Sequence, residues 1–365
     1  MAGGGTAGHV VPAVAIAETL VGRGHPRESI HFVGSTRGDD ARLVGAAGFD
    51  ITLLPGRGLA RRLTLANLQS LVGFSVALVR AVALLARRRP AVVVSMGGYA
   101  AAPVAIAAWL ARIPVVISEQ NAVPTATHRL VARFAAASAV PADGTPLPRA
   151  ITTGSPVRGE VLAVDASEEG RRRARRELGL PPRATVVAAV GGSLGSRTIN
   201  DAVVDLARRW AGRGDVAIRH AVGARDWDDV CRRLPAPAAG GLVYQVVRYE
   251  DRMPLLLAAS DLVVSRAGGT VWEIAVVGRA SILVPLPIAP FDHQAANAQV
   301  LVRAGAAVML RDPEVTADRL ASEIDALVAV PGRLAEMGAA ARGVAHRDAA
   351  ERVADVVEQH ARGSA

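Results

Sequence analysis

The sequence contains no lysine, one cysteine and few aromatic residues. All 42 of its basic residues are therefore arginine. A Walker-type phosphate loop and a Schiff-base enzyme both require a lysine side chain, so both classes are excluded. The single Cys231 allows neither an internal disulfide nor a zinc or iron–sulfur cluster, and it favours a reducing, cytoplasmic compartment. Aromatic residues make up 3% of the chain, too few for base-stacking platforms, so we expect no nucleic-acid partner.

Long apolar runs are missing as well. No uninterrupted run approaches the roughly 18 residues of a membrane-spanning helix. The chain opens in a glycine loop rather than a charged and then apolar leader, which predicts no signal peptide. The net charge of +9 is then available for acidic lipid or a phosphorylated substrate.

Short runs rich in Val, Ile and Ala alternate with longer helical stretches. This alternation predicts an α/β fold with parallel sheets covered on both faces. At 365 residues we expect two doubly wound, Rossmann-like domains with an interdomain cleft. The predicted domains are residues 1–157 and 158–346, with a C-terminal helix at 347–365 packing back on the first domain. The predicted strands are Ile30–Gly34, Ile51–Leu54, Ala91–Met96, Pro114–Ser118, Ala135–Val140, Ile151–Thr153, Thr185–Gly191, Val216–Val222, Leu242–Val247, Asp261–Ser265, Ser281–Pro285 and Ala306–Leu310.

Three glycine-containing segments open helices, where free backbone N–H groups and the helix dipole attract anions. They are GGGTAGH from Gly3 to His9, GGSLGSR from Gly191 to Arg197, and SRAGGTVWEI from Ser265 to Ile274. Such a loop normally follows a strand, yet only two residues precede the first one. The first strand of a doubly wound sheet is central. We therefore expect a gap in the middle of the sheet, and a native chain that begins several residues earlier.

Polar residues follow several predicted strands. Glu273, one turn into its helix, is placed to accept hydrogen bonds from a ribose diol, or is a plain first-turn acid. The segment from Phe291 to Ala298 offers side chains for sugar hydroxyls, although Asn297 also fits a simple helix contact. Gly97–Tyr99 and Ser118–Asn121 end two further strands, where ligand binding and helix capping both remain open.

Two motifs favour other functions only weakly. The loop at Gly3–Gly8 formally satisfies the dinucleotide pattern G-x-G-x-x-G. The acid expected after the second strand is absent because Asp40 comes too late, but Ser35 and Arg37 suit a 2′-phosphate. An NADP-dependent oxidoreductase therefore stays open. The segment Asp226–Asp229 superficially matches an Asp-x-Asp metal motif, and we interpret it as a solvated helix start.

The most amphiphilic stretch runs from Leu63 to Ala86, between Arg61-Arg62 and Arg87–Arg89. Such a helix would lie in a lipid interface with its arginines on anionic headgroups. An ordinary core helix with basic ends is the alternative.

Several motifs occur together in one order and spacing: GGGTAGHVVP, EQNAVP at Glu119–Pro124, SPVR at Ser155–Arg158, GGSLGSR, SRAGGTVWE and DHQAANA. Together they resemble the MurG family of UDP-N-acetylglucosamine transferases, which make lipid II for peptidoglycan. The resemblance extends from Gly3 to about Asp312.

The resemblance implies a GT-B fold and an inverting transfer that needs no metal or other cofactor. The implied donor is UDP-N-acetylglucosamine, and the implied acceptor is the muramyl 4-hydroxyl of undecaprenyl-pyrophosphoryl-N-acetylmuramyl-pentapeptide (lipid I). The enzyme would be peripheral, on the anionic cytoplasmic face of the cell membrane, and would serve cell-wall synthesis, cell shape and division. A UDP-sugar epimerase or binding protein of the same architecture remains an alternative.

The resemblance also implies roles for individual residues. His9 is the implied general base, and a structural hydrogen bond at the helix start is its alternative role. Asn121 is implied on the acceptor side, Glu273 at the ribose and Gln294 at the sugar. The implied substrate-binding residues are Thr6, Ala7, Gly8, Asn121, Arg158, Ser193, Glu250, Gly269, Thr270, Glu273 and Gln294. The sequence departs from the family pattern at Ala7, Thr125, His128, Leu194 and Ala295.

Overall fold

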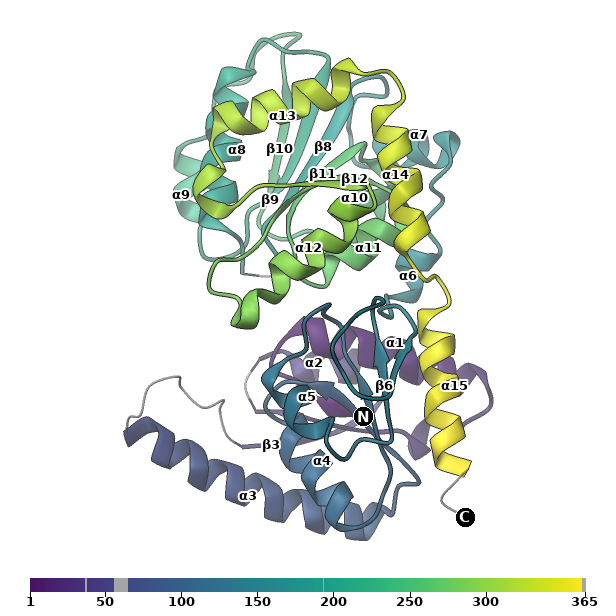
Figure 1. Cartoon of the computed structure of the whole chain (residues 1–365). Helices are drawn as coiled ribbons and strands as arrows, with labels where there is room; N and C mark the ends of the chain where they lie inside the picture. The colour runs from purple at the N-terminus through teal and green to yellow at the C-terminus, as the bar shows by residue number, and fades with distance from the viewer. Residues whose placement is uncertain (37, 56–64, 193, 363–365) are drawn as a thin grey trace. The chain divides into compact units, whose positions relative to one another are not determined.

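The computed structural model describes residues 1–36, 38–55, 65–192 and 194–362 (Figure 1). The chain forms two compact units. The first comprises Met1–Arg158 together with His346–Ala365, and the second comprises Gly159–Ala345. Each unit contains one parallel sheet with helices on both of its faces.

The first unit has seven parallel strands in the order β3-β2-β1-β4-β5-β6-β7. The strands are β1 Ala2–Gly3, β2 His31–Ser35, β3 Asp50–Leu54, β4 Val93–Gly97, β5 Val115–Ser118, β6 Ala137–Val140 and β7 Ala150–Thr152. The helices are α1 Ala7–Gly22, α2 Asp40–Ala46, α3 Leu65–Arg88, α4 Ala101–Leu110, α5 Ala126–Val131 and α15 Ala349–Arg362. Helices α3 and α4 cover one face, and α1, α2 and α15 cover the other.

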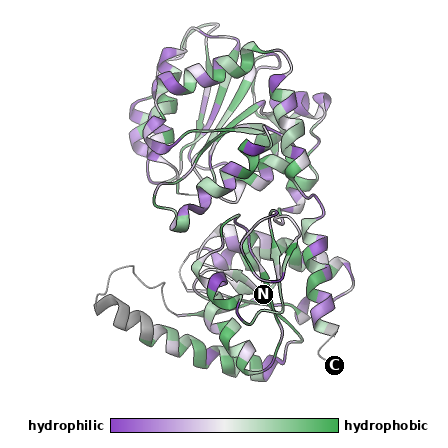
Figure 2. Ribbon diagram, in the orientation of Figure 1, coloured by the Kyte–Doolittle hydropathy of each residue, from purple (hydrophilic) through white to green (hydrophobic). Residues whose placement is uncertain are grey.

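Alternate residues of the central strands enter two separate cores. Val115 and Ile117 pack in the core beneath α3 and α4, whereas Val116 packs with α1 and α15. Successive strand residues point to opposite faces of a sheet. Because both faces are covered, most residues of both sets are apolar, with buried Ser95, Ser118 and Ser138 as exceptions, and many strand segments are coloured hydrophobic (Figure 2).

The central position of this sheet is occupied by β1, so the predicted gap is wrong. Ala2 pairs with Val33 of β2 on one side and with Ser95 of β4 on the other. Gly3 pairs with Gly97. Two residues carry no strand pattern of their own, and the hydrogen bonds from the strands on either side make them extended.

The second unit has six parallel strands in the order β10-β9-β8-β11-β12-β13. The strands are β8 Thr185–Val190, β9 Val216–Ala221, β10 Val243–Val247, β11 Leu262–Arg266, β12 Ala280–Val284 and β13 Ala307–Met309. The helices are α6 Gly159–Leu162, α7 Glu168–Glu177, α8 Arg197–Arg209, α9 Trp227–Arg232, α10 Met253–Ala259, α11 Thr270–Val277, α12 His293–Arg303, α13 Ala317–Ala329 and α14 Arg333–Val344. All twelve strands predicted from the sequence are confirmed, with ends within two residues of those predicted.

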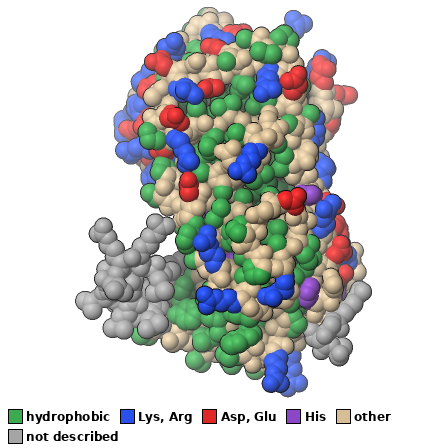
Figure 3. Space-filling view, viewed as in Figure 1, with side chains coloured by type: hydrophobic (Ala, Val, Ile, Leu, Met, Phe, Trp, Pro, Cys, Tyr) green, Lys and Arg blue, Asp and Glu red, His purple; other side chains and the backbone are tan. Residues whose placement is uncertain are grey.

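Helix α3 presents an apolar stripe outward. Its inner face is buried against the sheet and α4 at Ala77, Ala81, Leu84 and Leu85. Its outer face exposes four valines, Val72, Val76, Val79 and Val82, at 41–69% of their surface. Figure 3 shows hydrophobic side chains, with arginines among them, on this part of the first unit. Helix α3 is therefore a core helix along its inner face and leaves an apolar stripe along its outer face. Arg61, Arg62 and Leu63 lie outside the described residues.

Among the described residues, none of the helices is both long enough and apolar enough to cross a bilayer.

Candidate active site

The first glycine loop places His9 in the first turn of α1. Thr6 precedes the helix in an extended conformation, and its hydroxyl Oγ1 lies 3.2 Å from His9 Nδ1. The backbone of Gly4 also lies near the ring and raises the pKa of His9. Nδ1 is thus engaged by Thr6, and the tautomer of the ring decides which of the two atoms donates. Among the described residues, none hydrogen-bonds to Nε2.

Much of the predicted anion cradle in this loop is already filled by Asp40. This side chain is 1% exposed. Its carboxylate accepts hydrogen bonds from Gly5 N, at 2.9 and 3.0 Å, and from Ser35 N at 2.8 Å. Asp40 comes too late in the sequence to be the acid of a dinucleotide site, but α2 begins at Asp40 and turns its carboxylate back toward the loop, where it accepts from backbone amides. The amide of Ser35 therefore has a protein acceptor, and Arg37 lies outside the described residues.

Two glycines at the end of β4 make room for the His9 ring. Gly97 and Gly98 have φ angles of +90° and +77°, a region that side chains disfavour. A Cβ on Gly97 would lie 3.3 Å from His9 Nε2, and one on Gly98 would lie 2.3 Å from the Gly4 carbonyl oxygen. The Gly97–Tyr99 segment thus serves the packing of the first loop against β4.

The end of β5 carries a buried carboxylate beside His9. Glu119 is 1% exposed, and its carboxylate accepts hydrogen bonds from the backbone amides of Gln120, Asn121 and Thr125 and from the Asn121 side chain. It also lies 2.7 Å from His128 Nδ1. Burial alone would raise the pKa of Glu119, but His128 and the amide donors lower it to about 2. The carboxylate is therefore ionised, and it fixes the loop that carries Asn121.

The charges around His9 act on it in opposite directions. Burial lowers the pKa of His9 below its usual value of 6.5. Glu119 and Asp40 raise the pKa, and His128 lowers it. Sequence reasoning noted His128 only as a departure from a family pattern. The sequence offers only the spacing of nine residues between Glu119 and His128 as a sign that the two pair. The turn before α5, which brings the two side chains together, is visible only in the structure.

In the second unit, the third glycine loop and Gln294 come together at the carboxyl ends of β11 and β12. Gly269 precedes α11, which begins at Thr270, and Glu273 lies half-buried in its first turn. Gln294 Oε1 accepts a hydrogen bond from Leu286 N at 3.0 Å. A Cβ on Gly268 would lie 3.8 Å from Gln294 Nε2. The Gln294 amide therefore bridges two strand ends and faces the glycine loop.

The other predicted substrate-binding residues differ in burial and in the contacts they make. The Glu250 side chain is buried in an ion pair in which Arg219 Nε lies 2.5 Å from its carboxylate. Arg158 is partly exposed at the last position of the first unit. Gly8 is exposed in α1, the side chain of Ala7 is not described, and Ser193 lies outside the described residues.

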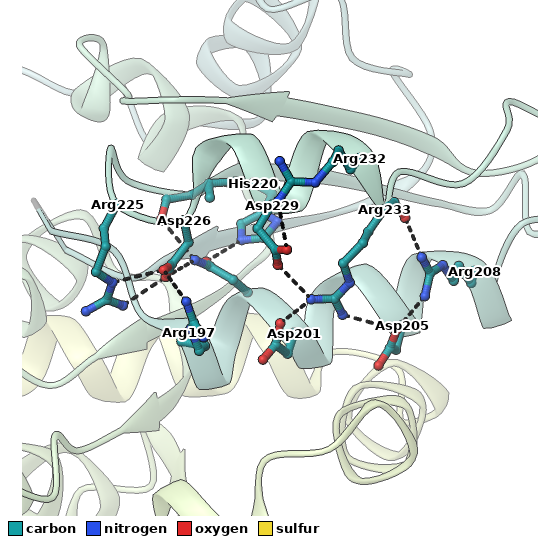
Figure 4. Close-up of polar contacts among 12 residues, drawn as sticks. Arg197, Asp201, Asp205, Arg208, His220, Arg225, Asp226, Asp229, Arg232 and Arg233 are labelled. Carbon is teal, nitrogen blue, oxygen red and sulfur yellow. Dashed lines mark hydrogen bonds and ion pairs between the residues drawn. The ribbon is translucent and has the colours of Figure 1, made fainter.

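A polar network lies next to Arg197, the last residue of the second glycine loop. Arg225 contacts both carboxylate oxygens of Asp226 at 2.8 and 2.9 Å, and Arg197, the last residue of the loop, lies 3.6 Å away (Figure 4). The Arg225 hydrogen bonds lower the pKa of Asp226. Asp226 is 3% exposed, which corrects our reading of this residue as solvated. It also accepts a hydrogen bond from Asn200 Nδ2.

His220 completes this network as a neutral ring. Asn200 uses its Nδ2 as a donor to Asp226 and Val222, so its Oδ1 accepts a hydrogen bond from His220 Nε2 at 2.9 Å. His220 Nδ1 then accepts from the Tyr244 hydroxyl at 2.8 Å. Burial lowers the pKa of His220 to about 3.

The second unit is therefore expected to lose stability in mild acid. An unfolded histidine binds its proton near pH 6.5, whereas folded His220 resists protonation until about pH 3. Stability should fall as the pH drops below 6.5, by up to about 1.4 kcal/mol per pH unit. Urea unfolding followed by tryptophan fluorescence tests this, since Trp210, Trp227 and Trp272 all lie in this unit. His220→Asn should flatten the dependence, and an equal slope in both proteins would contradict the assignment.

Comparison with known proteins identifies relatives over the whole chain. Residues 1–140 match the Glycosyltransferase family 28 N-terminal domain, and residues 186–353 match the corresponding C-terminal domain. A protein of Acidothermus cellulolyticus named UDP-N-acetylglucosamine–N-acetylmuramyl-(pentapeptide) pyrophosphoryl-undecaprenol N-acetylglucosamine transferase is 40% identical over 99% of this chain and 97% of its own. The crystal structure of Acinetobacter baumannii MurG superposes with a TM-score of 0.76 at 27% identity, covering 98% of both chains. The UDP-GlcNAc 2-epimerase of Neisseria meningitidis shares the fold, with a TM-score of 0.64 at 12% identity and 98% coverage of both chains.

Proposed function

This chain belongs to glycosyltransferase family 28 and to the MurG family, and we propose from that membership that it makes lipid II for peptidoglycan. The reaction transfers N-acetylglucosamine from UDP-N-acetylglucosamine to the muramyl 4-hydroxyl of undecaprenyl-pyrophosphoryl-N-acetylmuramyl-pentapeptide. The observation that carries this proposal is the full-length similarity to a transferase named for that reaction. The epimerase similarity lies at an identity that supports a common fold alone.

The surroundings of His9 suit a general base in this reaction. Its Nε2 has no hydrogen-bond partner among the described residues, and we assign to this nitrogen the unprotonated form that a base requires. As the acceptor hydroxyl oxygen attacks C1 of the donor sugar, Nε2 takes the hydroxyl proton. The new C1–O bond forms on the face opposite UDP, and the bond from C1 to the UDP oxygen breaks. UDP leaves with the electron pair, and the sugar configuration inverts.

The negative charge that develops on UDP needs preorganised donors. We assign this role to the loops that open α8 and α11, where the backbone amides of a helix N-terminus can donate to an anion. Glu273 and Gln294 would then bind the ribose and the sugar, Arg158 and Ser193 the phosphates, and the backbone at Glu250 the uracil. Thr6, Ala7, Gly8, Gly269 and Thr270 would line the donor, and Asn121 the acceptor. A cation is not part of this proposal.

The oxidoreductase alternative has less support. The amides of Gly5 and Ser35, which a dinucleotide would use, already donate to Asp40. The chain's relatives favour the transferase as well.

The decisive experiment measures UDP release with and without a lipid-linked muramyl acceptor. Release that requires the acceptor is expected for the transferase. Release or epimerisation without it would identify the other UDP-sugar activity. Calorimetric titration with UDP-N-acetylglucosamine and with NADP provides the second comparison, and tight binding of NADP alone would refute the proposal.

The stripe on α3 supports a peripheral position on the cytoplasmic face of the cell membrane. Four exposed valines lie beside Arg80, Arg87 and Arg88 on the same helix. Apolar side chains of this kind enter the headgroup boundary while arginines bind anionic lipid. Guanidinium groups keep their charge at any physiological pH, so the attraction should depend on salt rather than on pH.

Charged substitutions in this stripe are expected to weaken membrane binding. V76E/V79E should reduce co-sedimentation with anionic vesicles by about tenfold or more, because each change replaces an apolar contact with a charge that the lipid repels. Val330→Glu is the matched control, since Val330 is similarly exposed at 54% but lies in the second unit. Equal co-sedimentation of V76E/V79E and the control would remove α3 from the membrane contact. UDP-N-acetylglucosamine binding should be unchanged in both.

A further inference from the structure

His128 has an unusual set of partners for a buried histidine. Its side chain has no exposed surface, and it lies in the first turn of α5. Nδ1 lies 2.7 Å from the carboxylate of Glu119, and Nε2 lies 3.1 Å from the backbone carbonyl oxygen of Ser95. Both partners are acceptors when the carboxylate is ionised. A ring that donates from both nitrogens carries a proton on each and is an imidazolium.

The other contacts of Glu119 fix its ionised state. Three backbone amides and the Asn121 side-chain amide all donate to the carboxylate. A protonated acid would need an acceptor for its own proton, and each of these partners of Glu119 other than His128 is an N–H donor. The buried pair is therefore carboxylate and imidazolium, with no net charge.

This pair lies directly beside His9. A Cβ on Gly97 would be 3.3 Å from His9 Nε2 and also 3.3 Å from His128 Cε1, so these two ring atoms are no more than 6.6 Å apart. The glycine at position 97 keeps the space between the two rings free of a side chain. Two charges at this separation in a partly buried setting interact strongly.

We propose that His128 is a constitutive imidazolium whose pairing with Glu119 keeps the neighbourhood of His9 neutral and so holds His9 in its unprotonated form. His128 is thus a positioning residue that acts on the base through charge. Glu119 alone would place an uncompensated negative charge beside His9 and favour its protonation, as Asp40 does from the other side. Thr6 and Gly4 contact His9 without carrying charge. Only the catalytic consequence of this inference depends on the proposed function.

The charge of His128 can be tested without substrate. In the full chain labelled with ¹⁵N-histidine, both ring nitrogens of His128 should show the chemical shifts of protonated imidazolium from pH 6 to pH 9. His128→Asn identifies the signals by their disappearance. A spectrum of a neutral ring at pH 8, with one protonated and one bare nitrogen, would overturn the proposal. This measurement uses the wild-type protein and does not depend on whether a variant folds.

The effect on His9 is tested by a charge cycle. His128→Asn keeps a donor near the position of Nδ1 but removes the positive charge. The pKa of His9, read from its own NMR signal, should rise by about one unit or more, a tenfold change in its ionisation constant. E119Q/H128N restores neutrality, and the pKa should return to within a few tenths of the wild-type value. If His9 is the base, the pH at which kcat/KM falls on the acidic side of its pH profile should shift together with the pKa of His9.

A control separates charge from general disturbance. His31 lies in the same unit, where Nε2 contacts Thr52 Oγ1 at 2.8 Å, and His31→Asn should leave the pKa of His9 unchanged. An unmoved His9 pKa in H128N, or equal pKa values in H128N and E119Q/H128N, would refute the electrostatic role. If the NMR shifts appear but the rate profile does not follow, the proposal for His128 survives and the assignment of His9 as the base fails.

Discussion

Replacing His9 with alanine is expected to lower kcat by about 10²- to 10⁴-fold, the usual contribution of a general base. The donor should still bind within a few fold of the wild-type affinity, because the proposed base contacts the acceptor hydroxyl. Steady-state kinetics with a lipid-linked acceptor, combined with calorimetry for UDP-N-acetylglucosamine, measures both quantities. In the wild type, kcat/KM should fall in acid as His9 becomes protonated, with a midpoint below 6.5 because burial lowers the pKa of this ring.

His25 provides the matched control for this substitution. It lies just after α1, where its Nε2 contacts Glu358 at 2.9 Å and its side chain is 46% exposed. His25→Ala should leave kcat unchanged. A turnover of His9→Ala close to that of His25→Ala would exclude His9 as the base and favour its structural role at the start of the helix.

Replacing Glu119 with alanine is expected to destabilise the first unit by about 3–5 kcal/mol, the range for removing one partner of a buried ion pair. Three backbone amides and the Asn121 side chain lose their acceptor, and His128 loses its counter-charge. Two measurements on the full-length variant test this loss of stability: urea unfolding, and hydrogen exchange followed in the proteolytic fragment that covers residues 115–131.

A carboxylate in an exposed ion pair serves as the comparison. Glu351 contacts Arg23 from α15 but is 55% exposed, and Glu351→Ala should cost less than about 1 kcal/mol. Equal stability of the two variants would show that the Glu119 network contributes little.

The sheets were readable from the sequence because buried parallel strands are apolar on both faces. Runs such as Val93–Met96 are distinctive without any alternation of polar residues. The strand at Ala2–Gly3 could not be read in this way. Its two residues carry no periodicity, and its extended backbone depends on pairing with β2 and β4, which lie about 30 and 90 residues further along the chain.

In the candidate site, too, the sequence indicated the features that depend on local residues and missed those that depend on distant ones. Glycine loops at helix starts are local signals, so the segments around His9 and Gly269 were found directly. Asp40 and His128 were not, because each acts on residues that are distant in sequence. Asp40 contacts Gly5 because the chain reverses direction between β2 and α2. His128 contacts Glu119 because the segment from Glu119 to Thr125 forms a turn just before α5. The roles of the individual substrate-binding residues remain predictions.

The return of α15 to the first unit determines the order in which this protein can fold during synthesis. Val353, Val356 and Val357 of α15 complete the core that also contains Val10 and Ile16 of α1. These valines leave the ribosome after every residue of the second unit has been made. The unit that is translated first therefore carries an open apolar face until α15 has been made. We expect nascent chains that stop before α15 to need a chaperone there, while their second unit is already folded.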